Sequence, residues 1–232
     1  MTPEMTNCLR RSKRCVDTRA VSQLERISQE KATAQPLFLD MRAPSLFARG
    51  FIPGSINVPS MDCLAIIGSR SECSGQSVYV IASSALKRQG ERRLVERYSG
   101  IQVHGWLKPE VVREWSRTRG DLATIEELEP DRLAVRVAAW KTVVLDVREE
   151  SAFAQAHIPE ALHIPLDNIS HSVAGLPERT SISVVCETGE KAGFAGSLLS
   201  RLGYGEVAIL RGGFRAYVDA RLPIARRNVA KR

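Results

Sequence analysis

The chain has 232 residues, of which 44% are hydrophobic and 25% are charged, which allows one or two domains with ordinary buried cores. The net charge is +7, but residues 1–20 hold five basic and two acidic side chains, and residues 221–232 hold five basic ones and no acid. The remainder has a net charge of −1, which argues against a nucleic-acid-binding core. No apolar run reaches the roughly 18 residues of a membrane span, and no secretory signal is apparent. We therefore expect a soluble, cytoplasmic protein without nucleic-acid or membrane partners.

The cysteine pattern argues against both disulfides and zinc. The number of cysteines is odd and none form a CxxC pair, so we expect neither a disulfide framework nor a metal site, and a reducing compartment follows. Two of them fall in the expected basic tail and two in an expected loop, where they are interpreted as incidental thiols. The five cysteines are Cys8, Cys15, Cys63, Cys73 and Cys186.

The first predicted strand, Leu37–Asp40, belongs to a segment that occurs twice. It ends in an acid and is followed by a helical turn and then by Phe51–Pro59. The same pattern returns 106 residues later at Val143–Asp146 and His157–Pro165, and an ungapped alignment of 21 positions contains nine identities. Such self-similarity indicates that one domain is present twice.

Each copy reads strand, helix, short strand, loop, strand, helix, strand, with strands expected at Val78–Ile81 and Val207–Leu210. This alternation predicts an α/β fold of two repeated domains, each a mostly parallel sheet flanked by helices. Thr124–Glu127 resembles a capped helix start. A short helix is also conceivable around Val21–Ile27. The expected organisation is a basic tail at 1–26, a first domain at 27–116, a linker at 117–123, a second domain at 124–224 and a basic tail at 225–232.

Cys186 stands at the most informative junction of the chain. Ser181–Val185 predicts a buried strand, and the apolar spacing from Ala192 to Leu202 predicts a helix with one apolar face. A six-residue loop thus leads from Cys186 into a helix N-terminus, where backbone N–H groups favour a thiolate and an anionic substrate. The alternative is an inert buried cysteine, because free cysteines are often buried; the strand–loop–helix setting favours chemistry.

Several motifs together resemble the rhodanese (sulfurtransferase) family in its two-domain form. They are Leu145–Glu149, His157–Ala161, the loop that opens at Cys186, and Arg211–Phe214 followed by Leu222-Pro223. The resemblance extends over about residues 125–224 and about residues 27–115. It implies that Cys186 forms a persulfide and passes its sulfur on, without a metal or an organic cofactor.

The implied partners are a small sulfur donor, thiosulfate or a thiol-borne persulfide, and a thiol, cyanide or carrier-protein acceptor. The substrate-binding loop would then be Glu187, Thr188, Gly189, Glu190 and Lys191. Gly189 is expected to let the loop curl, Thr188 to donate a hydrogen bond, and Lys191 to supply positive charge. The two glutamates oppose a dianion such as thiosulfate and are expected to raise the pKa of the cysteine.

The first copy lacks the nucleophile, because Ala82 aligns with Cys186 and a methyl group cannot attack a donor. We therefore expect an inactive first domain. Asp146 and Arg148 recur in that copy, as Asp40 and Arg42, which favours structural roles for them. His157 and His163 are replaced by Phe51 and Asn57 there, which favours packing or backbone hydrogen bonding over acid–base catalysis.

Two other functions stay open at this point. One is a non-catalytic rhodanese-like binding or redox-sensing module, which the acidic loop residues favour. The other is a related phosphatase or arsenate reductase, which needs an arginine after five intervening residues to hold a tetrahedral oxyanion. That position is Ala192, so the sulfurtransferase interpretation leads.

Overall fold

The computed structural model describes residues 35–68, 76–83, 95–97, 99–172, 175–176 and 180–227, together with the isolated positions Leu24 and Ile27, which are helical and buried. The side chains of residues 170 and 171 are not part of this description. The described residues leave out most of the two expected tails, three of the cysteines, and part of the loop that follows the strand at residues 78–81. These cysteines and loop residues are Cys8, Cys15, Cys73 and Ser84–Lys87.

The first half of the chain forms a four-stranded parallel sheet with the strand order β2-β1-β3-β4. We call this sheet and its helices the first unit. Its buried strands are rich in branched and aromatic residues, as a sheet covered on both faces requires. Its elements are β1 (Leu37–Asp40), α2 (Pro44–Ala48), β2 (Ile56–Asn57), α3 (Met61–Gly68), β3 (Val78–Ile81), β4 (Val103–Leu107) and α5 (Glu110–Thr118).

The second half forms a five-stranded parallel sheet with the order β5-β9-β8-β6-β7, and this sheet with its helices is the second unit. Its elements are β5 (Glu126–Leu128), α6 (Pro130–Ala138), β6 (Val143–Asp146), α7 (Glu150–Gln155), β7 (Leu162–His163), η3 (Leu166–Asn168), α8 (Ile169–Ser172), β8 (Ile182–Val185), α9 (Glu190–Arg201), β9 (Val207–Leu210) and α10 (Gly213–Asp219).

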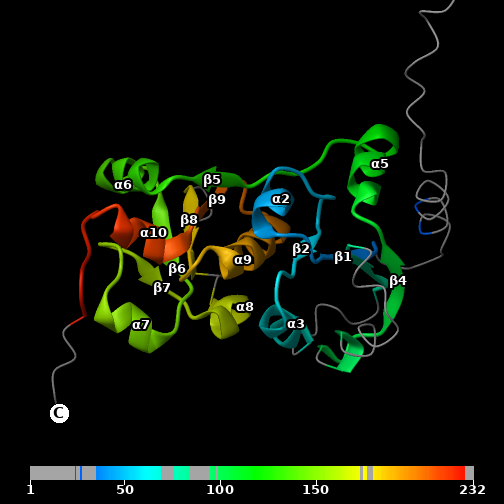
Figure 1. Ribbon diagram of the computed structural model, residues 1–232, viewed down its shortest axis with the longest axis horizontal. Helices are drawn as coiled ribbons and strands as arrows, with labels where there is room; N and C mark the ends of the chain where they lie inside the picture. The colour runs from blue at the N-terminus through cyan, green and yellow to red at the C-terminus, as the bar shows by residue number, and fades with distance from the viewer. Residues whose placement is uncertain are drawn as a thin grey trace, which may run out of the picture.

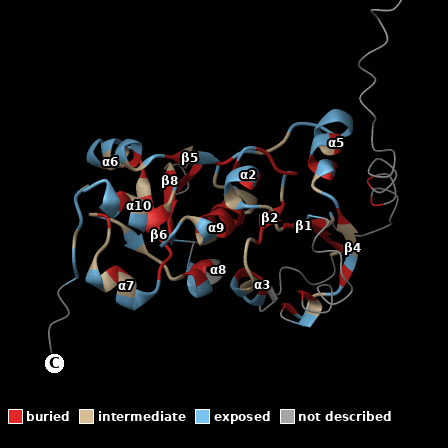
Figure 2. Cartoon of the chain, viewed as in Figure 1, coloured by how far each residue is buried: buried red, intermediate tan, exposed pale blue. Residues whose placement is uncertain are grey.

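One hydrophobic core joins the two units. Because side chains alternate between the faces of a strand, Leu37 and Leu39 of β1 face this shared core, whereas Phe38 faces a separate core beneath α5. In the second unit Val184 faces the shared core, and Val185 faces a third cluster beneath α6 and α10. Figure 2 shows the buried residues concentrated along the strands and along α9.

Helix α9 lies in the middle of the molecule, beside α2 and β2 of the first unit (Figure 1). Its residues from Ala192 to Leu199 are all buried. Ser197 Oγ accepts a hydrogen bond from the Asn57 backbone N–H at 3.0 Å, and Arg201 donates to the Gly54 carbonyl at 2.8 Å. The helix that follows Cys186 is therefore held against the first unit by hydrogen bonds.

The strands predicted at residues 37–40, 78–81, 143–146 and 207–210 are confirmed, whereas the predicted helix start at Thr124–Glu127 is wrong. These residues lead into β5, because pairing with β9 outweighs the local capping pattern. The helix begins at Pro130. Helix α5 extends to Thr118 and so takes the first two residues of the expected linker. Cys63 lies in α3 and not in a loop.

Candidate active site

Cys186 follows directly after β8, the central strand of the second sheet. Residues at the carboxyl ends of parallel strands gather at one edge of a sheet, which is where open α/β sheets bind ligands. The cysteine is only 3% exposed. Its sulfur accepts a hydrogen bond from the backbone N–H of Gly189 at 3.2 Å.

The loop between β8 and α9 is shorter than the sequence predicts. Helix α9 begins at Glu190, two residues before the predicted start, so Glu190 and Lys191 belong to its first turn. Gly189 precedes the helix with φ +91°, in the left-handed region that side-chain-bearing residues rarely adopt. This glycine turns the backbone so that its N–H points at the sulfur.

The first turn of α10 supports the cysteine loop through backbone hydrogen bonds. The backbone N–H of Phe214 donates to the Cys186 carbonyl at 2.8 Å, and that of Arg215 donates to the Glu187 carbonyl at 3.1 Å. Gly213 has φ +65°, and a Cβ atom there would collide with the Cys186 carbonyl oxygen. Gly213 thus allows the close backbone contact that fixes the loop.

Burial raises the pKa of the Cys186 thiol above its ordinary value, and this effect exceeds that of the loop. The backbone N–H groups of Gly189, Ala192, Lys191 and Thr188 act in the opposite direction. The predicted convergence of loop and helix amides on the sulfur is therefore present. The prediction that the thiolate is favoured overall is wrong, because removing the sulfur from water costs more than these amides return. The two glutamates, which the sequence predicts to raise the pKa of Cys186, are not among the causes of the rise, and burial is the leading one.

Arg148 neutralises part of the acidic loop. It is buried and forms an ion pair with Asp146 at 2.7 Å, donates to the Ala156 carbonyl at 2.7 Å, and lies 3.8 Å over the Phe214 ring. Its second terminal nitrogen contacts the Glu187 carboxylate at 3.3 Å. The structural role predicted for this arginine is confirmed, and the structure adds its link to the loop.

Lys191 does not extend freely toward the donor. Its ammonium lies 3.2 Å from the Asp62 carboxylate, on α3 of the first unit. Partial burial lowers the pKa of Lys191, but the hydrogen bond and charge of Asp62, followed by the charges of Cys63 and Glu149, raise it overall. The other two loop side chains, Thr188 and Glu190, are exposed and form no hydrogen bond or ion pair with the residues that the structure describes.

Comparison with known protein families finds a match within the second unit. The sequence profile of the rhodanese-like domain family matches residues 129–220. A sulfurtransferase from Allochromatium vinosum is 33% identical over 101 residues, which cover 43% of this chain and 94% of that protein. The chain belongs to the rhodanese-like domain family. Sulfur transfer is thus the chemistry of its relatives at the family level, and the parallel α/β sheets are those expected for this family.

Two further similarities lie at lower identity. The thiosulfate sulfurtransferase GlpE of Shewanella oneidensis is 25% identical to this rhodanese-like chain over 99 residues, which cover 43% of this chain and 98% of that protein. The crystal structure of the Alr3790 protein from Anabaena sp. is 26% identical, covers 44% of this chain and 94% of that one, and gives a TM-score of 0.40. Each of these matches covers less than half of this chain.

The histidines near the site have structural contacts. His157 contacts the Phe153 carbonyl through Nδ1 at 2.8 Å and stacks on that ring. His163 contacts the Arg148 carbonyl through Nε2 at 2.8 Å. Both contacts agree with the packing and backbone roles predicted for these residues. Sequence reasoning missed Asp62, since no local pattern connects α3 to the loop.

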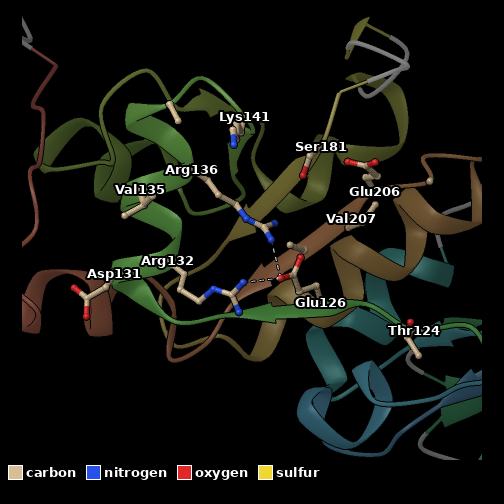
Figure 3. A pocket seen from close by; sticks show the side chains of 13 residues that line it. Thr124, Glu126, Asp131, Arg132, Val135, Arg136, Lys141, Ser181, Glu206 and Val207 are labelled. Atoms are coloured by element: carbon tan, nitrogen blue, oxygen red, sulfur yellow. Dashed lines mark hydrogen bonds and ion pairs between the residues drawn. The ribbon is translucent and has the colours of Figure 1, made fainter.

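A groove of about 800 Å³ lies on the opposite edge of the second sheet, where β5, β8 and β9 begin (Figure 3). Arg132 and Arg136 of α6 reach toward Glu126 there, with Arg136 at 2.7 Å. Because Cys186 stands at the far end of β8, this groove is not the thiol site. Among the described residues no group of His, Cys, Asp and Glu could hold a metal ion, and no described helix could cross a membrane.

Proposed function

We propose that this protein is a sulfurtransferase that carries sulfane sulfur as a persulfide on Cys186. One observation carries the proposal: the free thiol of Cys186 lies between the end of β8 and the start of α9, with the Gly189 N–H 3.2 Å from its sulfur. The backbone amides of such an arrangement offset part of the cost of burying negative charge on the sulfur and on an outer persulfide sulfur. The sulfurtransferase names of the relatives support the same chemistry.

The reaction has two displacement steps. In the first, the Cys186 thiolate attacks the outer sulfur of thiosulfate, the S–S bond of the donor breaks, and sulfite leaves with the electron pair; a persulfide anion remains on Cys186. In the second, cyanide or a thiolate attacks that outer sulfur and regenerates the Cys186 thiolate. A thiol-borne persulfide donor reacts in the same way, with a thiolate as leaving group. These displacements at sulfur require neither a metal nor an organic cofactor.

We also propose that the two units are repeated rhodanese-like domains and that only the second is active. The strand registers support this: Ile81 pairs with Asp40 in the first sheet, and Val185 pairs with Asp146 in the second. The next residue is Ala82 in the first unit and Cys186 in the second. Ala82 has no nucleophilic atom, so the first unit would serve the second by packing against it. The cytoplasm suits this chemistry because Cys186 must stay reduced.

The experiment that tests the function is mass spectrometry of the full chain after incubation with thiosulfate, mercaptopyruvate or a small persulfide. We expect a gain of one sulfur atom, about 32 Da, that maps to the peptide containing Cys186 and disappears on addition of cyanide, which becomes thiocyanate. Absence of this adduct with every donor would contradict the proposal. That result would favour the binding or redox-sensing alternative, for which the burial of Cys186 is the supporting observation.

A further inference from the structure

We propose that Asp62, in the first unit, is a specificity-determining residue that makes the Cys186 site favour singly charged sulfur donors over dianions such as thiosulfate. The inference rests on the proposed function and assigns to the first unit a part in choosing the donor. It follows from the ion pair between α3 and α9, from the charges around the loop, and from the charge of the donors.

The Asp62–Lys191 pair places a carboxylate of the first unit beside the thiol site. The backbone N–H of Lys191 is one of the amides that act on the Cys186 sulfur, and the ammonium of the same residue lies 3.2 Å from Asp62. Asp62 is therefore one lysine side chain away from an amide that faces the sulfur. With its side chain 72% exposed, it acts through charge and not through packing.

The other charges around the loop leave an excess of carboxylates. Arg148 forms one ion pair with the buried Asp146 and a second, longer one with Glu187, so its single positive charge is shared by two carboxylates. Arg215, whose backbone contacts the loop, is exposed and forms no ion pair with the described residues. The carboxylates that act on the loop or belong to it are Asp62, Glu149, Glu187 and Glu190.

Lys191 is the cation of the loop itself, and Asp62 determines whether its charge is available to a donor. While the pair is formed, an approaching anion meets a nearly neutral group instead of a positive one. The energy of an ion in a given potential is proportional to its charge. When Asp62 neutralises Lys191, a dianion therefore loses twice as much electrostatic attraction to the site as a monoanion does. The first unit thus shifts the preference of the site away from thiosulfate.

The test compares two donors that differ in charge but share the same reaction. Thiosulfate carries two negative charges, and methanethiosulfonate, CH3SO2S⁻, carries one. With either donor the Cys186 thiolate takes the outer sulfur, the donor S–S bond breaks, and sulfite or methanesulfinate leaves with the electron pair. The rate of persulfide formation on Cys186, followed by mass spectrometry of the full chain, is measured for both donors in each variant.

In Asp62→Asn we expect the rate constant per molar donor to rise about fivefold for thiosulfate and about twofold for methanethiosulfonate, as the charge ratio requires. Both gains should shrink as salt is raised from 0.02 to about 0.5 M. Lys191→Gln should have the opposite effect and slow thiosulfate more than methanethiosulfonate. Asp121→Asn is the matched control, because Asp121 is exposed and forms no ion pair with the described residues.

The outcomes separate this inference from the proposed function. Persulfide formation with both rates unchanged in Asp62→Asn would overturn the role of Asp62 and leave the sulfurtransferase intact. Equal gains for the two donors would also overturn it, since charge would not be the cause. If neither donor places sulfur on Cys186 in the unaltered protein, the proposed function fails and this inference fails with it. Thermal unfolding of each variant verifies that the fold is retained.

Discussion

The two units place different chemistry on the same strand framework. Val80 and Val184 each lie two residues before the position that Ala82 or Cys186 occupies. Val80 pairs with Trp106 of β4, and Val184 pairs with Ile209 of β9. The residues that follow β4 and β9 can therefore be compared position by position. Below the cysteine loop the second unit has Gly212-Gly213, where the first has Pro109-Glu110. Ala82 takes the place of the cysteine. The first unit thus lacks, at these positions, both the thiol and the glycine that lets the start of a helix contact the loop.

This difference teaches that a thiol at the end of a central strand is only one requirement of the site. In the second unit the loop also has a close backbone contact with the start of α10, which Gly213 permits. It leads into α9, which is held by hydrogen bonds to the first unit. The strands and the buried acids at their ends persist in both units, Asp40 with Arg42 and Asp146 with Arg148. These ion pairs therefore belong to the framework that both units share, whereas the thiol and Gly213 at these positions occur only in the second unit.

The largest effect is expected from Cys186→Ser, which should abolish persulfide formation because a hydroxyl is a far weaker nucleophile at sulfur. The protein should remain folded. Cys63→Ala is the control in the first unit: this thiol is fully buried, so its loss should cost about 1 kcal/mol of stability but leave the transfer rate of folded protein unchanged. Substantial transfer in Cys186→Ser would mean that the first unit or another thiol is active.

The glycine contact can be tested by Gly213→Ala. A methyl group there would collide with the Cys186 carbonyl and displace the loop, which should lower the rate of persulfide formation by about 100-fold. Gly100→Ala, in the first unit, is the matched control. Gly100 has φ +66°, almost that of Gly213, but nothing lies within 4 Å of an added Cβ atom. Equal losses in the two variants would attribute the effect to backbone strain and not to the loop.

The importance of the first unit as a cover for α9 can be tested by Gly193→Ala. Its Cβ atom would collide with the Asn57 side chain and lie 2.9 Å from Pro44, both in the first unit. We expect a loss of about 1–3 kcal/mol in the free energy of unfolding, measured by urea denaturation. Gly196→Ala on the same helix meets side-chain methyl groups at 3.2 Å or more and no backbone or polar atom, so it should cost less stability than Gly193→Ala. Similar stabilities of the two variants would contradict a tight contact between the units.

The pH dependence follows from the burial of both described thiols. Burial raises the pKa of Cys186 and that of Cys63, in the latter case against the smaller effects of Ser60 and Lys191. The reactive thiolate of Cys186 should therefore increase about tenfold per pH unit up to and beyond the ordinary thiol pKa of about 8.5. Alkylation by neutral iodoacetamide, followed for each cysteine by mass spectrometry, reports this directly. A plateau of the Cys186 rate below pH 7 would contradict the dominance of burial.

The raised pKa values of Cys186 and Cys63 also make stability depend on pH, but stability falls with rising pH whereas thiol reactivity increases. A thiol whose pKa is higher in the folded than in the unfolded state holds its proton longer when folded. Between the two pKa values the folded state binds more protons, so the free energy of unfolding falls as pH rises above the unfolded thiol pKa. Cys63→Ala should reduce this alkaline loss without changing stability at neutral pH beyond the cavity effect. Urea denaturation at pH 7 and pH 10 measures the difference.

The sequence predicts the strands of both units because their patterns are local. It also places Cys186 correctly, since the end of a buried strand and the start of a helix are visible in neighbouring residues. The pairing of β5 with β9 escapes prediction, because the two strands are far apart in sequence and the capping pattern around Thr124 favours a helix locally. The sequence predicts that Lys191 binds the donor, because its partner Asp62 lies far away in the chain and no local pattern reveals the pair.

The smallest effect concerns the two glutamates, which the sequence treats alike and the structure separates. Glu187 contacts Arg148 at 3.3 Å although 60% of its side chain is exposed, whereas Glu190 forms no ion pair with the described residues. Glu190 lies in the first turn of α9, whose backbone amides act on the Cys186 sulfur, whereas the Glu187 carboxylate is directed toward Arg148. Glu190→Gln should therefore raise the thiosulfate rate about twofold to threefold, and Glu187→Gln by less, with both gains decreasing as salt is added. The rate of persulfide formation with thiosulfate, measured by mass spectrometry at low and high salt, resolves differences of this size. A larger gain in Glu187→Gln would show that Arg148 is fully occupied by Asp146 and leaves this loop carboxylate uncompensated.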